Sequence, residues 1–291
     1  MKLLIDVGNS RVKWAFGTAA GFVALGETPH NEAEDLCALL DAAYAPGEIR
    51  VANVAGAEAA VRVAARLQEH FGVAPVFARS AACGAGVRNG YADPSQLGVD
   101  RWLAICAAFA RYRAPVCVVD AGTATTIDVV SGSGEHQGGL ILPGITLMQS
   151  ALLGSTGDLA RLASGSDRTR LRAVGSPADA GAVVPGPVPG SGEQGIALGR
   201  DTAVAIRDGA LQATACLVGA CLNHLRDGAV AGAGPGLLVL TGGAAPLLEA
   251  AVLRLAGAAG SSTVPGFHLV HRPQLVLEGL AMDPPCFQVA N

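Results

Sequence analysis

The sequence predicts an α/β protein of two similar domains, and three observations lead to this prediction. A strand-forming run followed by Asp-x-Gly occurs twice, at residues 3–8 and again at residues 117–122. Each copy is followed by further strand patterns and then by alternating helix and strand patterns. Pro115 interrupts the apolar periodicity just before the second copy, so the domains are expected to cover residues 1–114 and 115–291.

In the first half, runs of aliphatic and β-branched residues predict strands, and apolar residues three and four apart predict helices. Strands are expected at residues 2–7, 12–16, 22–26 and 49–54 and near residue 76. Helices are expected at residues 32–43, 58–71 and 100–113. The polar, glycine-rich stretch 80–98 lacks either periodicity and predicts a functional loop.

The second half repeats this plan. Strands are expected at residues 116–119, 126–130, 138–142, 237–240 and 268–270. Helices are expected at residues 145–153, 196–225 and 274–282 and from residue 246 onward. Residues 164–195, which are rich in Gly, Pro and Ser, predict a long, mobile surface loop. Three strands and then alternating helices and strands, twice over, resemble two ribonuclease-H-like domains of the actin-like ATPase superfamily, in which the active site lies in the cleft between the domains.

Composition excludes several classes of function. The 291 residues carry a net charge of −4, only two of the 20 basic residues are lysines, and no basic cluster occurs, so no nucleic-acid partner is expected. The longest uncharged stretch, residues 228–248, is broken by Gly and Pro, and the N-terminus lacks a signal peptide, so no membrane partner is expected. The seven cysteines form no CxxC pair, which favours buried, reduced thiols and a cytoplasmic protein.

The repeated Asp-x-Gly turns have the chemistry of a nucleotide site. An aspartate at a strand end can hold a hydrated Mg²⁺, and the glycine and small polar residues after it form a tight turn whose N–H groups can approach phosphate. Lys13 follows the first turn, where a cation can meet phosphate, although a surface lysine is the simpler interpretation. A third turn, at residues 241–243, reads Thr-Gly-Gly and matches the position beside the adenosine in that superfamily.

Other phosphate-binding and hydrolytic motifs are absent from the sequence. It contains no G-x-x-x-x-G-K-[ST], no G-x-S-x-G and no H-E-x-x-H. Residues 190–195 match G-x-G-x-x-G by letters, but they follow a proline-rich stretch instead of a strand, so a dinucleotide site is not expected there.

The segment Gly98-Val99-Asp100-Arg101-Trp102 opens the helix that closes the first half. An aspartate in the first turn of a helix commonly serves as a cap or as a partner of the helix dipole. Its neighbours support a second interpretation. Arg101 can bind a carboxylate or phosphate and Tyr91 lies just upstream, so the segment also fits a substrate-binding wall that contains a general base.

Three motifs, in this order and spacing, resemble type III pantothenate kinases: Asp6-Val-Gly-Asn-Ser with Lys13, Gly98-Val-Asp-Arg-Trp, and Asp120-Ala-Gly-Thr-Ala-Thr-Thr. Gly138-Gly139, Pro143-Gly144 and Thr202 fit as well, so the resemblance covers nearly the whole chain. It implies a homodimeric enzyme that phosphorylates pantothenate on its primary hydroxyl, the first step of coenzyme A synthesis. It also implies a need for ATP, Mg²⁺ and a monovalent cation, K⁺ or NH₄⁺.

The same resemblance implies a role for each matching residue. Asp100 would accept the proton of the hydroxyl, Asp120 would coordinate the monovalent cation, and Asp6 would reach Mg²⁺ through the phosphates. The residues implied in ATP binding are Asp6, Val7, Gly8, Asn9, Ser10, Arg11, Val12, Lys13 and Thr123. The residues implied in pantothenate binding are Tyr91, Gly98, Val99, Asp100, Arg101 and Thr202. Ser10 stands where threonine is more usual, which keeps the hydroxyl.

Two alternatives remain open at this stage. The family also resembles the Bvg accessory factors, which were first regarded as helpers of transcription, so a regulatory protein without kinase activity is one alternative. This chain keeps Asp6, Asp100 and Asp120 together, which favours the enzyme. A different small-molecule kinase or phosphatase of the same superfamily is the other alternative, but it should lack the Gly98-Val-Asp-Arg segment.

Overall fold

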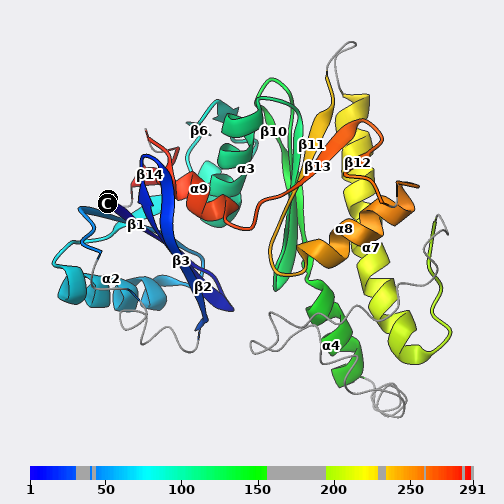
Figure 1. Cartoon of the computed structure of the whole chain (residues 1–291), viewed down its shortest axis with the longest axis horizontal. Coiled ribbons are helices and arrows are strands. Elements are labelled where there is room, and N and C mark those ends of the chain that lie inside the picture. Colours follow the sequence, from blue (N-terminus) through cyan, green and yellow to red (C-terminus); the bar gives the residue numbers. More distant parts are fainter. Residues whose placement is uncertain are drawn as a thin grey trace. The chain divides into compact units, whose positions relative to one another are not determined.

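The computed structural model describes residues 1–30, 40, 44–155, 195–228, 234–258, 260–283 and 286–289. It divides into two compact units (Figure 1). Unit 1 comprises Met1–Arg113, Gly134–Gly138 and Gln274–Asn291, and unit 2 comprises Ala114–Ser133 and Gly139–Pro273. The expected loop at 164–195 lies outside the described residues up to residue 194, and so does the expected helix at 32–43 apart from residue 40.

Unit 1 contains a six-stranded sheet of order β14-β5-β4-β1-β2-β3. Its strands are β1 (Lys2–Val7), β2 (Arg11–Thr18), β3 (Gly21–Pro29), β4 (Glu48–Asn53), β5 (Val76–Arg79) and β14 (Gln288–Val289). The first three strands are antiparallel neighbours, whereas β4 runs parallel to β1 and β5 runs parallel to β4. The short β14 pairs antiparallel with β5 at the edge and was not expected from the sequence.

Helices cover both faces of this sheet because its strands alternate two sets of apolar residues. On one face, Ile5 and Val51 pack with Leu67 of α2 (Ala57–Phe71) in a single core. The other face contacts α9 (Leu275–Ala281), which packs on α3 (Val99–Tyr112). The two helices approach closely because a Cβ on Gly279 would stand 2.5 Å from the Leu103 carbonyl oxygen. Glycine is therefore required at this crossing.

Unit 2 contains a second six-stranded sheet, of order β10-β9-β8-β11-β13-β12. Its strands are β8 (Val116–Ala121), β9 (Ala124–Val130), β10 (His136–Pro143), β11 (Gly236–Thr241), β12 (Thr263–Val264) and β13 (Phe267–His271). As β1 does in unit 1, β8 pairs antiparallel with the strand that follows it, β9, and parallel with β11 on its other side. Two sheets with the same strand order confirm the expected fold class of two ribonuclease-H-like α/β domains.

Among its described residues, unit 2 contains the helices α4 (Ile145–Ser155), α7 (Thr202–Asp227) and α8 (Ala245–Leu255). Residues of α7 and α8 pack with β8, β9 and β11 in one apolar core. The expected start of the long helix at residue 196 is wrong. Asp201 caps the helix instead, because its carboxylate accepts a 2.9 Å hydrogen bond from the Val204 N–H, and the helix begins at Thr202.

The stretch 80–98, expected to lack regular elements, contains a two-stranded hairpin and a single 3₁₀ turn. The hairpin is β6 (Cys83–Gly84) with β7 (Val87–Arg88), and the turn, η2, covers Pro94–Gln96. Both residues that join β6 to β7 have positive φ, 55° at Ala85 and 87° at Gly86, as tight hairpins require. Two-residue strands are too short to produce a periodic pattern, which is why the sequence did not indicate them.

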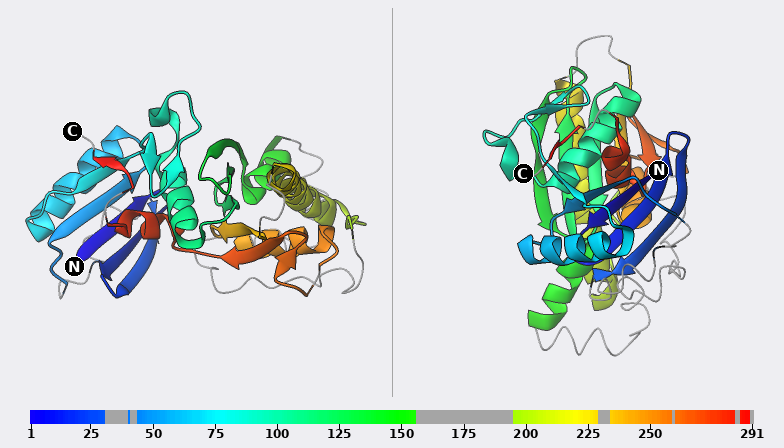
Figure 2. Two further views of the ribbon diagram at one scale, coloured as in Figure 1. Left: turned by 90° about the horizontal axis from the view of Figure 1, so that it is seen from above. Right: turned by 90° about the vertical axis from the view of Figure 1, so that its left-hand side faces the viewer.

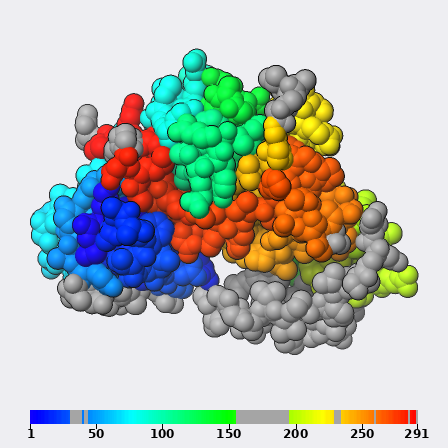
Figure 3. All heavy atoms as spheres, turned by 45° about the horizontal axis from the view of Figure 1, so that its top comes forward, coloured from blue at the N-terminus to red at the C-terminus, as the bar shows by residue number. Residues whose placement is uncertain are grey.

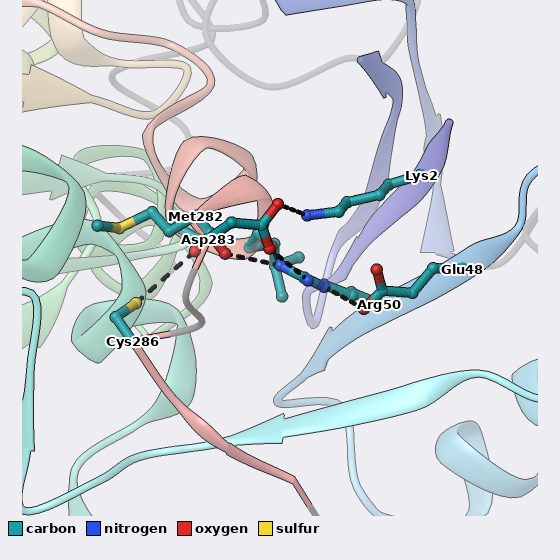
Figure 4. Close-up of polar contacts among 8 residues, drawn as sticks. Lys2, Glu48, Arg50, Met282, Asp283 and Cys286 are labelled. Atoms are coloured by element: carbon teal, nitrogen blue, oxygen red, sulfur yellow. Dashed lines mark hydrogen bonds and ion pairs between the residues drawn. The ribbon is translucent and has the colours of Figure 1, made fainter. Parts of the chain in front are cut away.

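The segment after α9 is held on unit 1 by a buried arginine (Figure 4). Arg50 of β4 is only 3% exposed and donates to the carbonyl oxygens of Leu280 and Met282, at 2.9 and 2.8 Å. It also donates to Asp283 at 2.8 Å, and Asp283 forms a second ion pair with Lys2 of β1. In Figures 2 and 3 this segment, coloured red, lies beside the first strands, coloured blue. The sequence placed the segment in the second domain, whereas its contacts group it with unit 1.

The described cysteines differ in their burial. Cys106, Cys117 and Cys286 are buried and unpaired by disulfides, as expected, whereas Cys83 and Cys216 are exposed. Among the described residues, no helix is both long and apolar enough to span a bilayer.

Candidate functional site

The register of unit 1 places three charged residues of the first hairpins in a row. Lys13 lies opposite Asp6 on the neighbouring strand, and Glu27 lies opposite Lys13 on the next. Residues directly opposite one another point to the same face of a sheet. Ile5 and Val7 point into the core beneath α2, so Asp6 between them points to the face that α9 covers.

The turn between β1 and β2 is closed by Gly8. Its N–H donates to the Arg11 carbonyl oxygen at 3.0 Å, and a Cβ at this position would also stand 3.0 Å from that oxygen. Asn9 and Ser10 at the tip of the turn are exposed. Arg11 forms an ion pair with Glu27 of β3. The turn therefore presents small polar residues and backbone to solvent, which is the arrangement that phosphate-binding turns share.

Two of the residues expected in ATP binding have their side chains in the core. Val7 and Val12 are 1% and 0% exposed and pack with the other apolar residues beneath α2. Because these two side chains are buried, only the backbone atoms of Val7 and Val12 can contact a ligand.

Asp100 lies in the first turn of α3, as the sequence predicted. Gly98 precedes the helix, and its carbonyl oxygen accepts the first helical hydrogen bond from Trp102 at 3.0 Å. One carboxylate oxygen of Asp100 accepts a 2.8 Å hydrogen bond from the Arg101 N–H. The positive end of the helix dipole stabilises the ionised carboxylate that a general base requires. Val99 is buried, so its side chain anchors this turn.

Tyr91 and Arg101 form the wall beside Asp100. The guanidinium of Arg101 donates to the Tyr91 hydroxyl oxygen at 2.9 Å, and its Cζ lies 5.7 Å from the centre of the phenol ring. Arg101 is 6% exposed, which is unusual for arginine. The backbone of Tyr91 is fixed by Asn89, whose amide oxygen accepts the Tyr91 N–H at 3.0 Å and whose amide nitrogen donates to the Ala81 carbonyl oxygen at 3.2 Å.

One residue of this wall was missed by sequence reasoning. His136 opens β10, is 3% exposed, and stacks its ring on Tyr91. It stands 45 positions after Tyr91 in the chain. The only signal was its place in the polar run just before Gly138-Gly139, which does not distinguish a ligand-facing histidine from a turn residue.

In unit 2, Asp120 lies at the end of β8 as expected. It pairs across the sheet with Thr241 of β11 and with Thr126 of β9. Gly242 follows with φ of 86°, and a Cβ there would collide with a carboxylate oxygen of Asp120 and with the Ala121 backbone. Glycine at position 242 thus lets the Thr-Gly-Gly turn pass close to the Asp120 carboxylate. We call this turn, together with the carboxylate that it contacts, the cradle. Carboxylate and carbonyl oxygens are the donors that K⁺ prefers, so the residues fit a monovalent cation.

Thr123 is exposed on the turn between β8 and β9. Its carbonyl oxygen accepts the Gly144 N–H at 2.9 Å, so α4 begins directly against this turn. Thr202 is partly exposed and is the first residue of α7, one position after the Asp201 cap. Its hydroxyl therefore lies at the positive end of a long helix.

The described residues place the candidates in two groups. Unit 1 holds Asp6 to Lys13 and the segment from Tyr91 to Arg101, whereas unit 2 holds Asp120, Thr123 and Thr202. Among the residues that the structure describes, no group of three or more His, Cys, Asp or Glu side chains could hold a metal ion. A single carboxylate such as Asp6 fits the usual mode of Mg²⁺, which is held by one or two carboxylates and by substrate phosphates.

Comparison with known proteins gives a consistent result. A family model described as "Type III pantothenate kinase" matches residues 2–224. A type III pantothenate kinase from Azoarcus sp. (strain BH72) is 37% identical over 284 residues, which cover 97% of this chain and 90% of that relative. One from Halorhodospira halophila is 36% identical and covers 96% of both chains. One from Aromatoleum aromaticum is 48% identical over 162 residues, which cover 55% of this chain and 65% of that relative.

Proposed function

Because this chain belongs to the type III pantothenate kinase family, we propose that Asp100 is the general base of its reaction. The family's enzymes transfer the γ-phosphoryl group of ATP to pantothenate and yield 4′-phosphopantothenate, the first step of coenzyme A biosynthesis. The observation that carries the proposal is the position of Asp100. Its carboxylate lies in the first turn of α3, next to the buried Arg101 and its partner Tyr91.

The substrate hydroxyl needs a proton acceptor as the new bond to phosphorus forms. Asp100 takes that proton in this proposal, and its place in the first turn of α3 fixes the position of its carboxylate. Arg101 and the Tyr91 hydroxyl bind polar groups of pantothenate, Gly98 and Val99 supply the adjoining backbone, and Thr202 contributes its hydroxyl. Arginine suits the carboxylate of pantothenate because its planar guanidinium can donate two parallel hydrogen bonds.

The triphosphate of ATP binds at the first turn in this proposal. Gly8, Asn9 and Ser10 present the N–H groups, and Lys13 supplies a positive charge on the same face as Asp6. Thr123 contacts the nucleotide from its own turn. Phosphoryl transfer asks the protein mainly for positioning and for neutralisation of charge. Mg²⁺, bound with ATP and reached by Asp6, supplies part of that neutralisation.

Asp120 is proposed to hold a K⁺ or NH₄⁺ ion. The close approach of Gly242 and the Ala121 backbone to this carboxylate supports the role, because glycine keeps a side chain away from the carboxylate oxygens. A monovalent cation there would offset negative charge near the phosphates and keep the turn ordered.

We further propose that the enzyme is a cytoplasmic homodimer. The exposed apolar residues Leu140 and Ile141 on edge strand β10, with Leu147 and Leu152 on α4, support a subunit interface. The six described cysteines are all free, as is usual in a reducing compartment. Light scattering of the purified chain would show about twice the mass of one chain if the dimer forms.

A coupled assay of ATP consumption tests the function. Purified protein with Mg²⁺ is assayed with and without pantothenate, first in K⁺ and then in Na⁺. Turnover that depends on both pantothenate and K⁺ would support the substrate, the reaction and the role of Asp120 together. Equal rates in Na⁺ would refute the cation site alone, and the absence of turnover in every salt would favour the regulatory alternative.

A further inference from the structure

His136 is a buried polar residue in direct contact with the wall of the proposed pantothenate site. Its ring stacks on the Tyr91 ring with centroids 6.0 Å apart and an angle of 12° between the planes. Its Nδ1 accepts a hydrogen bond of 3.4 Å from the Gly90 N–H. The histidine thus contacts both the side chain of Tyr91 and the peptide that precedes it.

The strand that carries His136 is fixed against the Tyr91 segment at several points. The Arg88 N–H donates to the Gly134 carbonyl oxygen at 2.8 Å, and Arg88 also forms a β-bridge and a 3.3 Å ion pair with Glu135. A Cβ on Gly90 would collide with the His136 carbonyl oxygen. Glycine at position 90 therefore allows this close approach, and the approach brings the imidazole onto the phenol ring.

On its other side Tyr91 contacts Arg101. Since arginine can only donate, the Tyr91 oxygen is the acceptor of the 2.9 Å hydrogen bond between them. The phenol proton is left to donate to another acceptor. The direction in which it points depends on how the ring is held, and the ring is held by Arg101 and His136 together.

We propose that His136 is a positioning residue for pantothenate, which orients the Tyr91 hydroxyl toward an acceptor oxygen of the substrate. The inference rests on the proposed function, because Tyr91 and Arg101 are assigned there to the same substrate. His136 itself does not touch the reacting atoms. Its effect is on the affinity for pantothenate, not on ATP and not on the chemical step.

Three variants test this role in the intact enzyme: His136→Ala, which removes the ring; His136→Phe, which keeps a ring but not the nitrogen; and His268→Ala, which removes an exposed histidine of β13 as a control. We expect His136→Ala to raise KM for pantothenate by about two- to tenfold, the worth of one aromatic pair, with KM for ATP and kcat unchanged. His136→Phe should return KM for pantothenate most of the way to the wild-type value, and His268→Ala should match the wild type.

Each other outcome overturns the inference. An unchanged KM for pantothenate in a folded His136→Ala enzyme would show that the stacking does not serve the substrate. An equal rise in KM for pantothenate and for ATP in His136→Ala, together with a lower Tm and no return of KM toward the wild-type value in His136→Phe, would show a purely structural role. Wild-type enzyme that does not turn over pantothenate would instead refute the proposed function, and this inference with it.

Discussion

The indole N–H of Trp102 donates a 2.7 Å hydrogen bond to the carbonyl oxygen of Cys286. Trp102 lies two positions after Asp100 on α3, and Cys286 lies beyond α9, more than 180 residues later in the chain. The Cys286 thiol in turn donates to the Gly279 carbonyl oxygen of α9 at 3.7 Å. The helix that presents the proposed base is thus anchored to the segment that Arg50 holds on the sheet.

The first prediction concerns this anchor. Trp102→Phe keeps an aromatic ring in the core but leaves the buried Cys286 carbonyl oxygen without its donor. We expect a loss of about 1–3 kcal/mol in the free energy of unfolding, since an unsatisfied buried acceptor costs that much. Urea denaturation of both proteins measures it. Stability within about 0.5 kcal/mol of the wild type would show that the bond does not hold α3.

Asp283 leads to a prediction about acid. Hydrogen bonds from Lys2 and then from Arg50 lower the pKa of its carboxyl below the ordinary value of 3.8. A lowered pKa in the folded state adds stability above the unfolded pKa, and this addition disappears as the pH falls through the folded pKa. Because the side chain is 62% exposed, we expect no more than about 1 kcal/mol.

Asp283→Asn should therefore be less stable than the wild type near neutral pH, and the difference should shrink as the pH falls below 3.8. Urea denaturation over a pH series measures this difference. Asp227→Asn is the matched control, because the ion pair of this exposed carboxylate with Arg226 is long, at 3.9 Å. A difference that stays constant with pH would contradict the ion-pair explanation.

A third prediction tests the base. Asp100→Asn removes the proton acceptor but retains an oxygen that can accept the Arg101 N–H. We expect kcat to fall about 10²–10⁴-fold, with KM for ATP and the unfolding free energy little changed. Steady-state kinetics of Asp100→Asn, with Asp227→Asn as the control, measure the change in kcat. A near-normal kcat in Asp100→Asn would rule out Asp100 as the base.

The cradle around Asp120 allows a paired test. Gly242→Ala places a methyl group against the carboxylate at a positive φ, whereas a Cβ on Gly243 meets no atom within 4 Å. We expect Gly242→Ala to lose about 1–3 kcal/mol of stability and to need more K⁺ for half-maximal activity, and Gly243→Ala to behave as the wild type. If the K⁺ requirement were the same in both variants, the cradle would not be the cation site.

Much of the fold was predictable because its signals are local. The Asp-x-Gly turns after Ile5 and Val119 and the alternating patterns around them indicated two similar sheets, and the Asp100 segment was proposed as part of a site from its neighbours in sequence. The start of α7 was wrong because the side-chain cap at Asp201 competes with an apolar pattern that continues upstream. His136 was missed because its contact with Tyr91 depends on a pairing between distant segments.

Because Gln274–Asn291 belong to unit 1, that unit can be completed only when translation reaches the end of this sequence. A ribosome completes β1 to β5 and α3 long before it reaches residues 275–287, yet these late residues hold the Leu280 carbonyl that Arg50 binds, the Cys286 carbonyl that Trp102 binds and the Gly279 that packs on Leu103. Domains commonly fold as they emerge, N-terminal first. Here the core beneath α2 can form early, but the helix bearing Asp100 gains its final anchor only when translation is almost finished. A chain released early would lack that anchor and would be a natural target for proteolysis.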